Sequence, residues 1–127
     1  DLLHVGHLDY LEKARALGDA LYVGVNGDAS TTRLKGAGRP LVPAVERARL
    51  LAALAPVSAA IIFEEDTADA ILSALQPDIY VKGGDYRRKP LPEQDTVRAY
   101  GGKIVLIDYL PDHSTSGLIE KIRSIPR

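Results

Sequence analysis

Apolar residues recur along the chain with two different spacings, and these spacings predict its secondary structure. From residue 8 to residue 17 they follow the period of a helix, and Gly18 ends that pattern. Residues 20–26 and 59–63 are short, nearly continuous apolar runs, which are typical of strands covered on both faces of a sheet. The first part of the chain is therefore predicted to contain a helix and two buried strands.

The remaining elements follow from the same spacings and from turn residues. Pro43 is placed to begin one helix, and Thr67 to cap another. Residues 27–43 are polar and punctuated by glycine and proline, which predicts a long loop. Further strands are predicted over residues 78–82 and 103–108, and helices over residues 44–54, 67–75, 93–100 and 116–125.

Alternating helices and strands predict an α/β fold, a Rossmann-like doubly wound parallel sheet, in one domain that spans residues 1–127. Such sheets bind ligands beyond the carboxyl ends of their strands. The segments that follow the predicted strands are therefore expected to converge on one site. They are residues 26–39, 64–67, 82–88 and 108–116.

Composition limits the partners and the compartment. The net charge of −1 argues against a broadly basic surface, so that nucleic acid is not an expected partner. The absence of cysteine excludes disulfides and thiolate metal sites, and it fits a reducing compartment. Because no apolar run reaches transmembrane length, no membrane partner is expected and a cytoplasmic location is predicted.

The start of the first predicted helix carries the most informative pattern, His4-Val5-Gly6-His7. The first amide groups of a helix lack intrahelical partners and the helix dipole is positive there, so that a helix start binds anions. Two imidazole donors, with a glycine between them that lets a bulky anion approach the backbone, indicate phosphate chemistry. A metal-binding pair is the rival interpretation, but no third ligand lies nearby in the sequence.

Other segments carry further candidate groups. Residues 114–116, Ser-Thr-Ser, precede the last predicted helix and either bind phosphate or simply cap that helix. Lys35 and Arg39 lie in the long predicted loop, where they either neutralise phosphate or are solvated charges. Asp85, after two glycines at a strand end, could accept hydrogen bonds from ribose or bind a metal, whereas an ordinary glycine turn explains the segment equally well.

These motifs together resemble those of the nucleotidyltransferases of the cytidylyltransferase-like family. Residues 4–7 are similar to the His-x-Gly-His signature of that family, and residues 114–116 to its C-terminal Ser-Thr-Ser/Thr motif. Residues 25–36, 63–67 and 81–86 resemble one branch, the adenylyltransferase domains that make ADP-heptose for lipopolysaccharide. The likeness runs essentially from end to end of the chain.

The resemblance implies transfer of AMP from ATP to a sugar 1-phosphate, heptose 1-phosphate, by in-line attack on the α-phosphate with release of pyrophosphate. It implies that His4, His7 and Lys35 are catalytic, because they stabilise charge on the phosphates. Mg²⁺ is the implied cofactor, bound through phosphate oxygens and water rather than by protein ligands. The implied nucleotide-binding residues are Asp1, Gly6, Asp85, Ser114, Thr115 and Ser116, and the implied sugar phosphate-binding residues are Asn26, Asp28, Arg39 and Arg47.

The resemblance also raises expectations about what surrounds the chain. The family pattern has an apolar strand before Asp1, at the centre of the sheet beside residues 20–26. This first strand is missing from the chain, which is therefore expected to be an N-terminally truncated nucleotidyltransferase domain. Family members commonly form homodimers, and in some relatives the domain follows a sugar kinase domain. Gly117 stands where a larger residue is common.

Three other functions remain open on the sequence. The nearest is a CTP-dependent cytidylyltransferase that acts on glycerol phosphate or another polyol phosphate. A non-catalytic nucleotide-binding module is more remote, because His4, His7, Lys35 and residues 114–116 are all retained. A fragment of a class I aminoacyl-tRNA synthetase would share the His-x-Gly-His pattern, but it would need a second lysine-rich loop and a tRNA-binding region.

Overall fold

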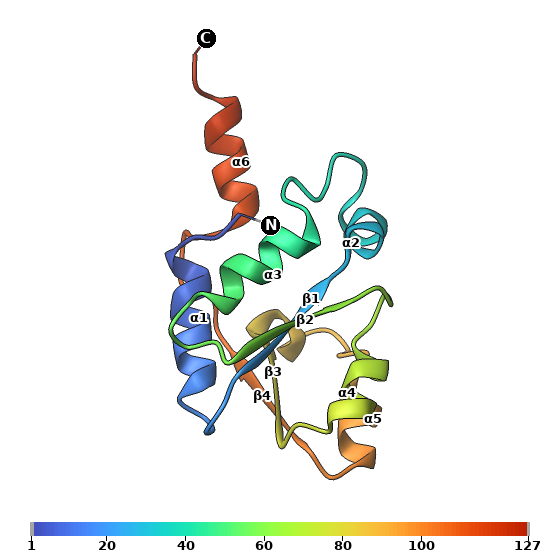
Figure 1. Ribbon diagram of the computed structural model, residues 1–127. Coiled ribbons are helices and arrows are strands. Elements are labelled where there is room, and N and C mark those ends of the chain that lie inside the picture. Colours follow the sequence, from blue (N-terminus) through green and yellow to red (C-terminus); the bar gives the residue numbers. More distant parts are fainter. Residues whose placement is uncertain (1, 127) are drawn as a thin grey trace.

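Helices and strands alternate along the chain as the sequence predicts (Figure 1). This computed structural model describes residues 2–126. The helices are α1 (Val5–Arg15), α2 (Asp28–Lys35), α3 (Ala44–Ala52), α4 (Asp69–Leu75), α5 (Gln94–Ala99) and α6 (Thr115–Arg123), with a 3₁₀ helix η1 (Gly84–Arg87). The strands are β1 (Tyr22–Asn26), β2 (Ala59–Phe63), β3 (Ile79–Gly83) and β4 (Lys103–Ile107).

The strands form two parallel pairs. β1 pairs with β2, with Tyr22 opposite Ala59, and β3 pairs with β4, with Ile79 opposite Lys103. The parallel direction confirms the expected βαβ organisation. The described residues do not form one continuous sheet, however, because no ladder joins the β1–β2 pair to the β3–β4 pair.

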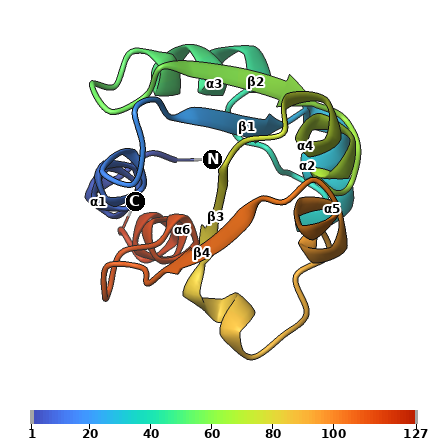
Figure 2. The same cartoon turned by 90° about the horizontal axis from the view of Figure 1, so that it is seen from below.

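β1 and β3 are the inner strands of the two pairs (Figure 2), and few of their residues are fully buried. Parallel strands covered by helices are normally buried on both faces. Yet Tyr22 is 58% exposed, and only Val25 in β1 and Gly83 in β3 are buried. The strand expected before Asp1 lies outside the described residues and stays a prediction.

The apolar core lies between the strands and the helices packed on them. α3 packs on β1 and β2, whereas α1 and α5 contact β4. In Figure 2, α1 and α6 lie on one side of the strands and α4 and α5 on the other. Across residues 2–126, no helix is long and apolar enough to cross a membrane. The buried apolar residues are Leu11, Ala14, Val25, Ala44, Val57, Leu72, Leu91 and Val97.

One prediction of local structure is wrong, because the segment expected to be a loop contains α2. The buried residues of α2 are polar, Ser30 and Thr31, and a polar buried face leaves no apolar period in the sequence. The Thr31 hydroxyl donates to the carbonyl of Gly27, four residues earlier, which satisfies it within the helix (2.9 Å). Gly36, with a φ of 95°, ends the helix, and only residues 36–43 form a loop.

Two helix starts also differ from the prediction. α4 begins at Asp69, and Thr67 is not its cap, because the Thr67 hydroxyl donates to Oδ2 of Asp69 instead (2.6 Å). α6 begins at Thr115, one residue earlier than predicted. Its N-cap is Ser114, whose side-chain oxygen accepts from the backbone N–H of Gly117 (2.9 Å).

Candidate functional site

Helix α1 begins at a pair of imidazoles that cap it. His4 is the N-cap, and its Nδ1 accepts a hydrogen bond from the backbone N–H of Gly6 (3.1 Å). In return, the backbone N–H of His4 donates to Nδ1 of His7 (3.3 Å). The two rings therefore satisfy amides at the helix start, as serine and glutamate side chains do in a capping box.

This reciprocal capping determines which nitrogen of each ring carries the proton. A neutral imidazole has one N–H and one acceptor nitrogen. In His4 and His7, Nδ1 is the acceptor because it faces a backbone amide, so that the proton lies on Nε2. The Nε2–H of each ring is then available to donate to a ligand.

Both rings are held in the neutral form. Burial, followed by the charge of His4, lowers the pKa of His7 to about 4. Burial, followed by the charge of His113, lowers the pKa of His4. The His4 and His7 ring centroids are 4.0 Å apart, so that two positive charges there would repel each other at close range. At neutral pH the pair therefore offers two uncharged N–H donors.

The first turns of α1 and α6 meet, so that residues 4–7 and 114–116 lie together as the sequence predicts (Figure 1). The Thr115 hydroxyl donates to the carbonyl of Leu2, just before α1 (3.0 Å). His113 lies beside His4, with 6.3 Å between the ring centroids, and Ser116 is exposed in the first turn of α6. Two helix starts and several hydroxyls at one place favour a multiply charged anion.

Gly6 permits this close approach. A Cβ atom at position 6 would lie 2.8 Å from the His4 ring and 2.9 Å from Cβ of His113. Only a residue without a side chain fits between the two histidines. The predicted part of Gly6 in nucleotide binding stays a prediction, and Asp1 lies outside the described residues.

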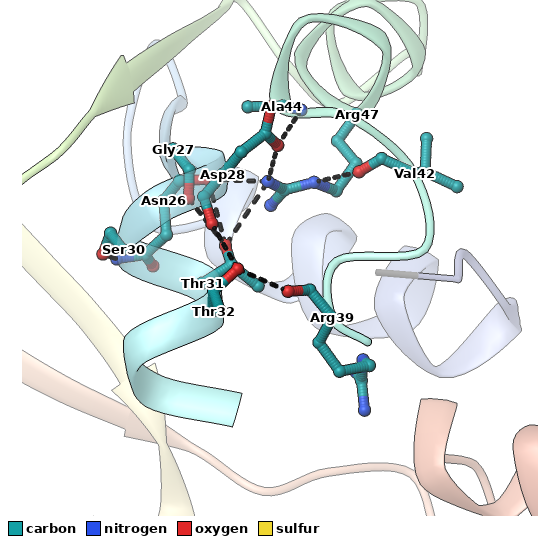
Figure 3. A network of polar contacts seen from close by, with 10 residues as sticks. All are labelled: Asn26, Gly27, Asp28, Ser30, Thr31, Thr32, Arg39, Val42, Ala44 and Arg47. Carbon is teal, nitrogen blue, oxygen red and sulfur yellow. Dashed lines mark hydrogen bonds and ion pairs between the residues drawn. The ribbon is translucent and has the colours of Figure 1, made fainter. Parts of the chain in front are cut away.

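Arg47 of α3 holds together the segments on another side of the site (Figure 3). Its Nε donates to the carbonyl of Val42 and its Nη2 to the carbonyl of Asn26, both at 2.8 Å. Nη2 also lies 3.4 Å from Oδ1 of Asp28, which accepts from the backbone N–H of Ala44 (2.7 Å). These bonds connect the end of β1, the start of α2 and the start of α3.

The arginine is thus engaged with the protein itself. Its side chain is only 12% exposed, whereas that of Asp28 is 57% exposed. Asn26 is engaged too, because its Nδ2 donates to Oγ of Ser30 (3.0 Å). The contacts indicate that Arg47 positions this part of the site. The predicted binding of sugar phosphate by Asn26, Asp28 and Arg47 stays a prediction.

Two adjoining hollows lie at the carboxyl end of β1. Asn26 and Arg47 line both of them. The predicted catalytic residues His7 and Lys35 therefore line neighbouring spaces that share a wall. The cationic hollow, of about 170 Å³, is lined by Asn26, Thr31, Leu34, Lys35, Arg39 and Arg47. The apolar hollow, of about 180 Å³, is lined by Leu3, His7, Gly24, Val25, Asn26, Arg47, Leu50 and Leu51.

The last residue of α2, Lys35, and the loop that follows it, which carries Arg39, line the same hollow. Gly36 and Gly38 have positive φ angles of 95° and 85°, which turn the chain sharply. The Thr32 hydroxyl then donates to the carbonyl of Arg39 (2.7 Å), so that the loop folds back against α2. Lys35 and Arg39 thus line one hollow, and their binding of phosphate stays a prediction.

Asp85 lies apart from the two hollows, neither of which it lines. It follows β3 in η1 and pairs with Lys89 (3.0 Å), and this hydrogen bond raises the pKa of Lys89. Close by, the rings of Tyr10 and Tyr109 stack with their centroids 5.9 Å apart. Burial, followed by the charges of Tyr109 and Asp85, raises the pKa of Tyr10. Asp85 thus belongs to a second, aromatic part of this face.

Sequence reasoning missed His113 and the tyrosine pair. His113 directly precedes the Ser-Thr-Ser run and is the third histidine of the chain, so that its position was a usable signal. Tyr10 and Tyr109 are too far apart in sequence to form a local pattern. Only the packing of α1 beside the end of β4 brings them together.

The donors at this site suit an anion better than a metal ion. In the part of the chain that the structure describes, no group of three or more histidine or acidic side chains is placed to hold a metal. Neutral N–H donors, two helix starts and nearby cations instead match phosphate oxygens.

Comparisons with known proteins agree with this chemistry. Residues 1–120 match the family model described as cytidylyltransferase-like. The bifunctional protein HldE of Geotalea uraniireducens is 51% identical over 124 residues, and that of Citrifermentans bemidjiense is 52% identical over 124 residues. Each alignment covers 98% of this chain but only 25% and 26% of the relatives, so that the chain spans about a quarter of their length.

A solved structure is similar as well. The lipopolysaccharide core biosynthesis protein from Thermoplasma volcanium superposes with a TM-score of 0.68 at 29% identity. The match covers 87% of this chain and 88% of that one. This likeness supports the Rossmann-like α/β fold.

Proposed function

The chain belongs to the cytidylyltransferase-like family, and we propose that it transfers AMP from ATP to heptose 1-phosphate and releases pyrophosphate. The observation that carries this proposal is the pair of neutral Nε2–H donors at the start of α1, beside the start of α6. The identity of about half of the residues to HldE proteins supports the choice of nucleotide and sugar.

The reaction needs no strong base. The attacking group is an oxygen of the sugar phosphate, which is already ionised at neutral pH. Its bond to the α-phosphorus forms as the bond from that phosphorus to the bridging oxygen breaks, and pyrophosphate leaves with the electron pair. Catalysis then consists of positioning and of stabilising charge, which fixed donors do well.

The histidines stabilise charge without carrying any. His4 and His7 donate from Nε2 to phosphate oxygens of the triphosphate, and their bonds to the helix backbone keep the rings oriented. Because capping holds them in place before the substrate arrives, little reorganisation is needed in the transition state. The start of α6, with Ser114, Thr115 and Ser116, binds the β- and γ-phosphates.

The cationic hollow binds the phosphate that is being joined. Lys35 and Arg39 line it and supply positive charge, while Arg47 keeps its walls in place. Asn26 and Asp28 lie at the same end of β1 and contact the sugar phosphate. Asp85, together with Asp1 and Gly6, helps to bind the nucleotide.

Mg²⁺ accompanies the nucleotide in this proposal. The described residues contain no group of three or more histidine or acidic side chains suited to a metal, so that phosphate oxygens and water would hold the ion. The ion would neutralise charge on the leaving pyrophosphate. A sugar kinase, fused or separate, is the class of enzyme that would supply the sugar phosphate. We further expect a cytoplasmic location, and a homodimer stays a prediction.

The proposal is tested by measuring pyrophosphate release from ATP or CTP in the presence of heptose 1-phosphate. We expect release with ATP and little with CTP. Release with CTP and glycerol phosphate, but not with ATP, would replace the proposal with a cytidylyltransferase. The variant His7→Ala should fold and lose turnover. A nucleotide-binding module would show no turnover before any substitution.

A further inference from the structure

We propose that His113 is a third phosphate-binding residue, which in its protonated form donates from Nε2 to the triphosphate held between the first turns of α1 and α6. The inference rests on the proposed function in one respect only, the identity of that anion. It adds to the site a charged donor whose strength depends on pH, beside two donors that are neutral.

The place of His113 in the fold supports this role. It directly precedes Ser114, the N-cap of α6, and its ring lies 6.3 Å from that of His4. Its Cβ comes so close to Gly6 that a side chain at position 6 would not fit. His113 is also exposed, so that a ligand at the junction of the two helix starts can reach its ring.

The hydrogen bonding of His113 is opposite to that of His4. Nδ1 of His113 lies 2.7 Å from the carbonyl oxygen of Pro111. A carbonyl oxygen only accepts, so that Nδ1 must carry a proton. In neutral His113, Nε2 is then a bare lone pair that repels phosphate oxygens. Only the imidazolium form has a proton on Nε2, and this form also adds a positive charge.

The groups that surround His113 are two imidazoles of the opposite tautomer and one acidic neighbour in sequence. On α1 it faces His4, with His7 behind, and both of these rings are held neutral. Asp112 precedes it on its own loop, and the first turn of α6 carries no titratable side chain. An arriving triphosphate brings negative charge to this cluster, and among the three imidazoles only His113 has an Nε2 that lacks a proton in its neutral form.

The test uses sodium tripolyphosphate, which carries the phosphates without a nucleoside. Its affinity for the purified protein is measured by calorimetry between pH 6 and pH 8, in two buffers of different ionisation enthalpy. Relative to a variant that lacks the His113 ring, the wild-type protein should bind about tenfold more tightly at pH 6 and similarly at pH 8, because imidazolium supplies a charge-assisted hydrogen bond only at the lower pH. The comparison cancels the titration of tripolyphosphate itself, which affects both proteins equally. The wild-type protein should also take up more protons on binding than the variants.

Two variants separate charge from structure. His113→Asn keeps an amide N–H that can reach the Pro111 carbonyl, but it removes Nε2. It should bind about tenfold more weakly at pH 6 and within about twofold of wild type at pH 8. His113→Lys keeps a positive charge at every pH in the range, so that its affinity relative to His113→Asn should stay the same at pH 6 and pH 8. Lys121→Gln, at the far end of α6, is the control for loss of a distant charge and should change affinity by less than about twofold.

Either of two results would overturn the inference. One is unchanged affinity and unchanged proton uptake in His113→Asn at pH 6. The other is an equal loss at both pH values that His113→Lys does not repair, which would indicate a purely structural contact with Pro111. If His113→Asn fails to fold, the affinity of His113→Lys relative to wild type, compared at pH 6 and pH 8, decides. Tripolyphosphate binding is measured without adenylyl transfer. The role of His113 can therefore fail while the proposed function stands, and the proposed function can fail while the role of His113 stands.

Discussion

Replacing Arg47 with methionine tests whether this residue builds the site or binds the substrate. Methionine keeps an unbranched, apolar chain of similar length, but it removes every donor of the guanidinium. The carbonyls of Val42 and Asn26 each lose a hydrogen bond of 2.8 Å. Asp28 loses the nearby positive charge at 3.4 Å.

The size of the effect follows from these contacts. A hydrogen bond from a charged donor contributes about 1.5–3 kcal/mol to stability. Two such bonds are lost from a side chain that is 12% exposed, and water can replace part of them. The Asp28 contact adds little, because the carboxylate is 57% exposed. We therefore expect Arg47→Met to lower the free energy of unfolding by about 2–4 kcal/mol.

Urea unfolding followed by circular dichroism measures this change, with Arg49→Met as the matched control. Arg49 lies on the same helix and is exposed, so that its replacement should change stability by less than about 0.5 kcal/mol. A structural role for Arg47 is excluded if the free energy of unfolding of Arg47→Met lies within about 1 kcal/mol of wild type while its KM for sugar phosphate rises more than tenfold. Arg47 would then bind substrate rather than hold α2 and α3 together.

Three further predictions follow from the same geometry. The pKa of His7 is lowered to about 4 in the folded protein, below its value in the unfolded chain, so that protonation favours unfolding. The free energy of unfolding should therefore fall by roughly 1–2 kcal/mol as the pH drops from about 6.5 to about 4, after allowance for solvent screening. Acid titration followed by circular dichroism measures this change, and no change across the range would contradict the burial of the ring. Gly6→Ala should abolish tripolyphosphate binding and lower stability by about 1–3 kcal/mol, whereas Gly18→Ala, whose nearest atom would lie 4.0 Å from the new Cβ, should do neither. The amides of β1 and β3 that point away from their paired strands, β2 and β4, should exchange their hydrogens fast in this chain. In a longer form that supplies the expected central strand, the same amides should exchange slowly. Slow exchange already in this chain would speak against such a strand.

Much of the fold could be predicted because most elements bury an apolar face. The four strands were recognisable as short apolar runs, and each prediction overlaps the observed strand closely. Helix α2 escaped because its buried residues, Ser30 and Thr31, are polar and bond within the helix or to neighbouring backbone. A pattern of hydrophobic positions carries no information about such a face.

The site was predictable where function depends on a short local motif. The start of α1 contains His4, Gly6 and His7 within four residues, and residues 114–116 lie together at the start of α6. Both motifs are therefore visible in the sequence. The positioning role of Arg47 could not be predicted from the sequence, because its hydrogen bonds join β1, α2 and α3, which are well separated along the chain. The tautomers of the histidines also depend on three-dimensional contacts, since the backbone amides that face each Nδ1 decide where the proton lies.

The most direct test of the account is a nitrogen–proton correlation spectrum of the three imidazoles at pH 7, recorded with and without ATP. We predict that His4 and His7 are neutral with the proton on Nε2, and that their Nε2–H signals shift when ATP binds. Charged rings, a proton on Nδ1 of either residue, or signals that ATP leaves unmoved would contradict it.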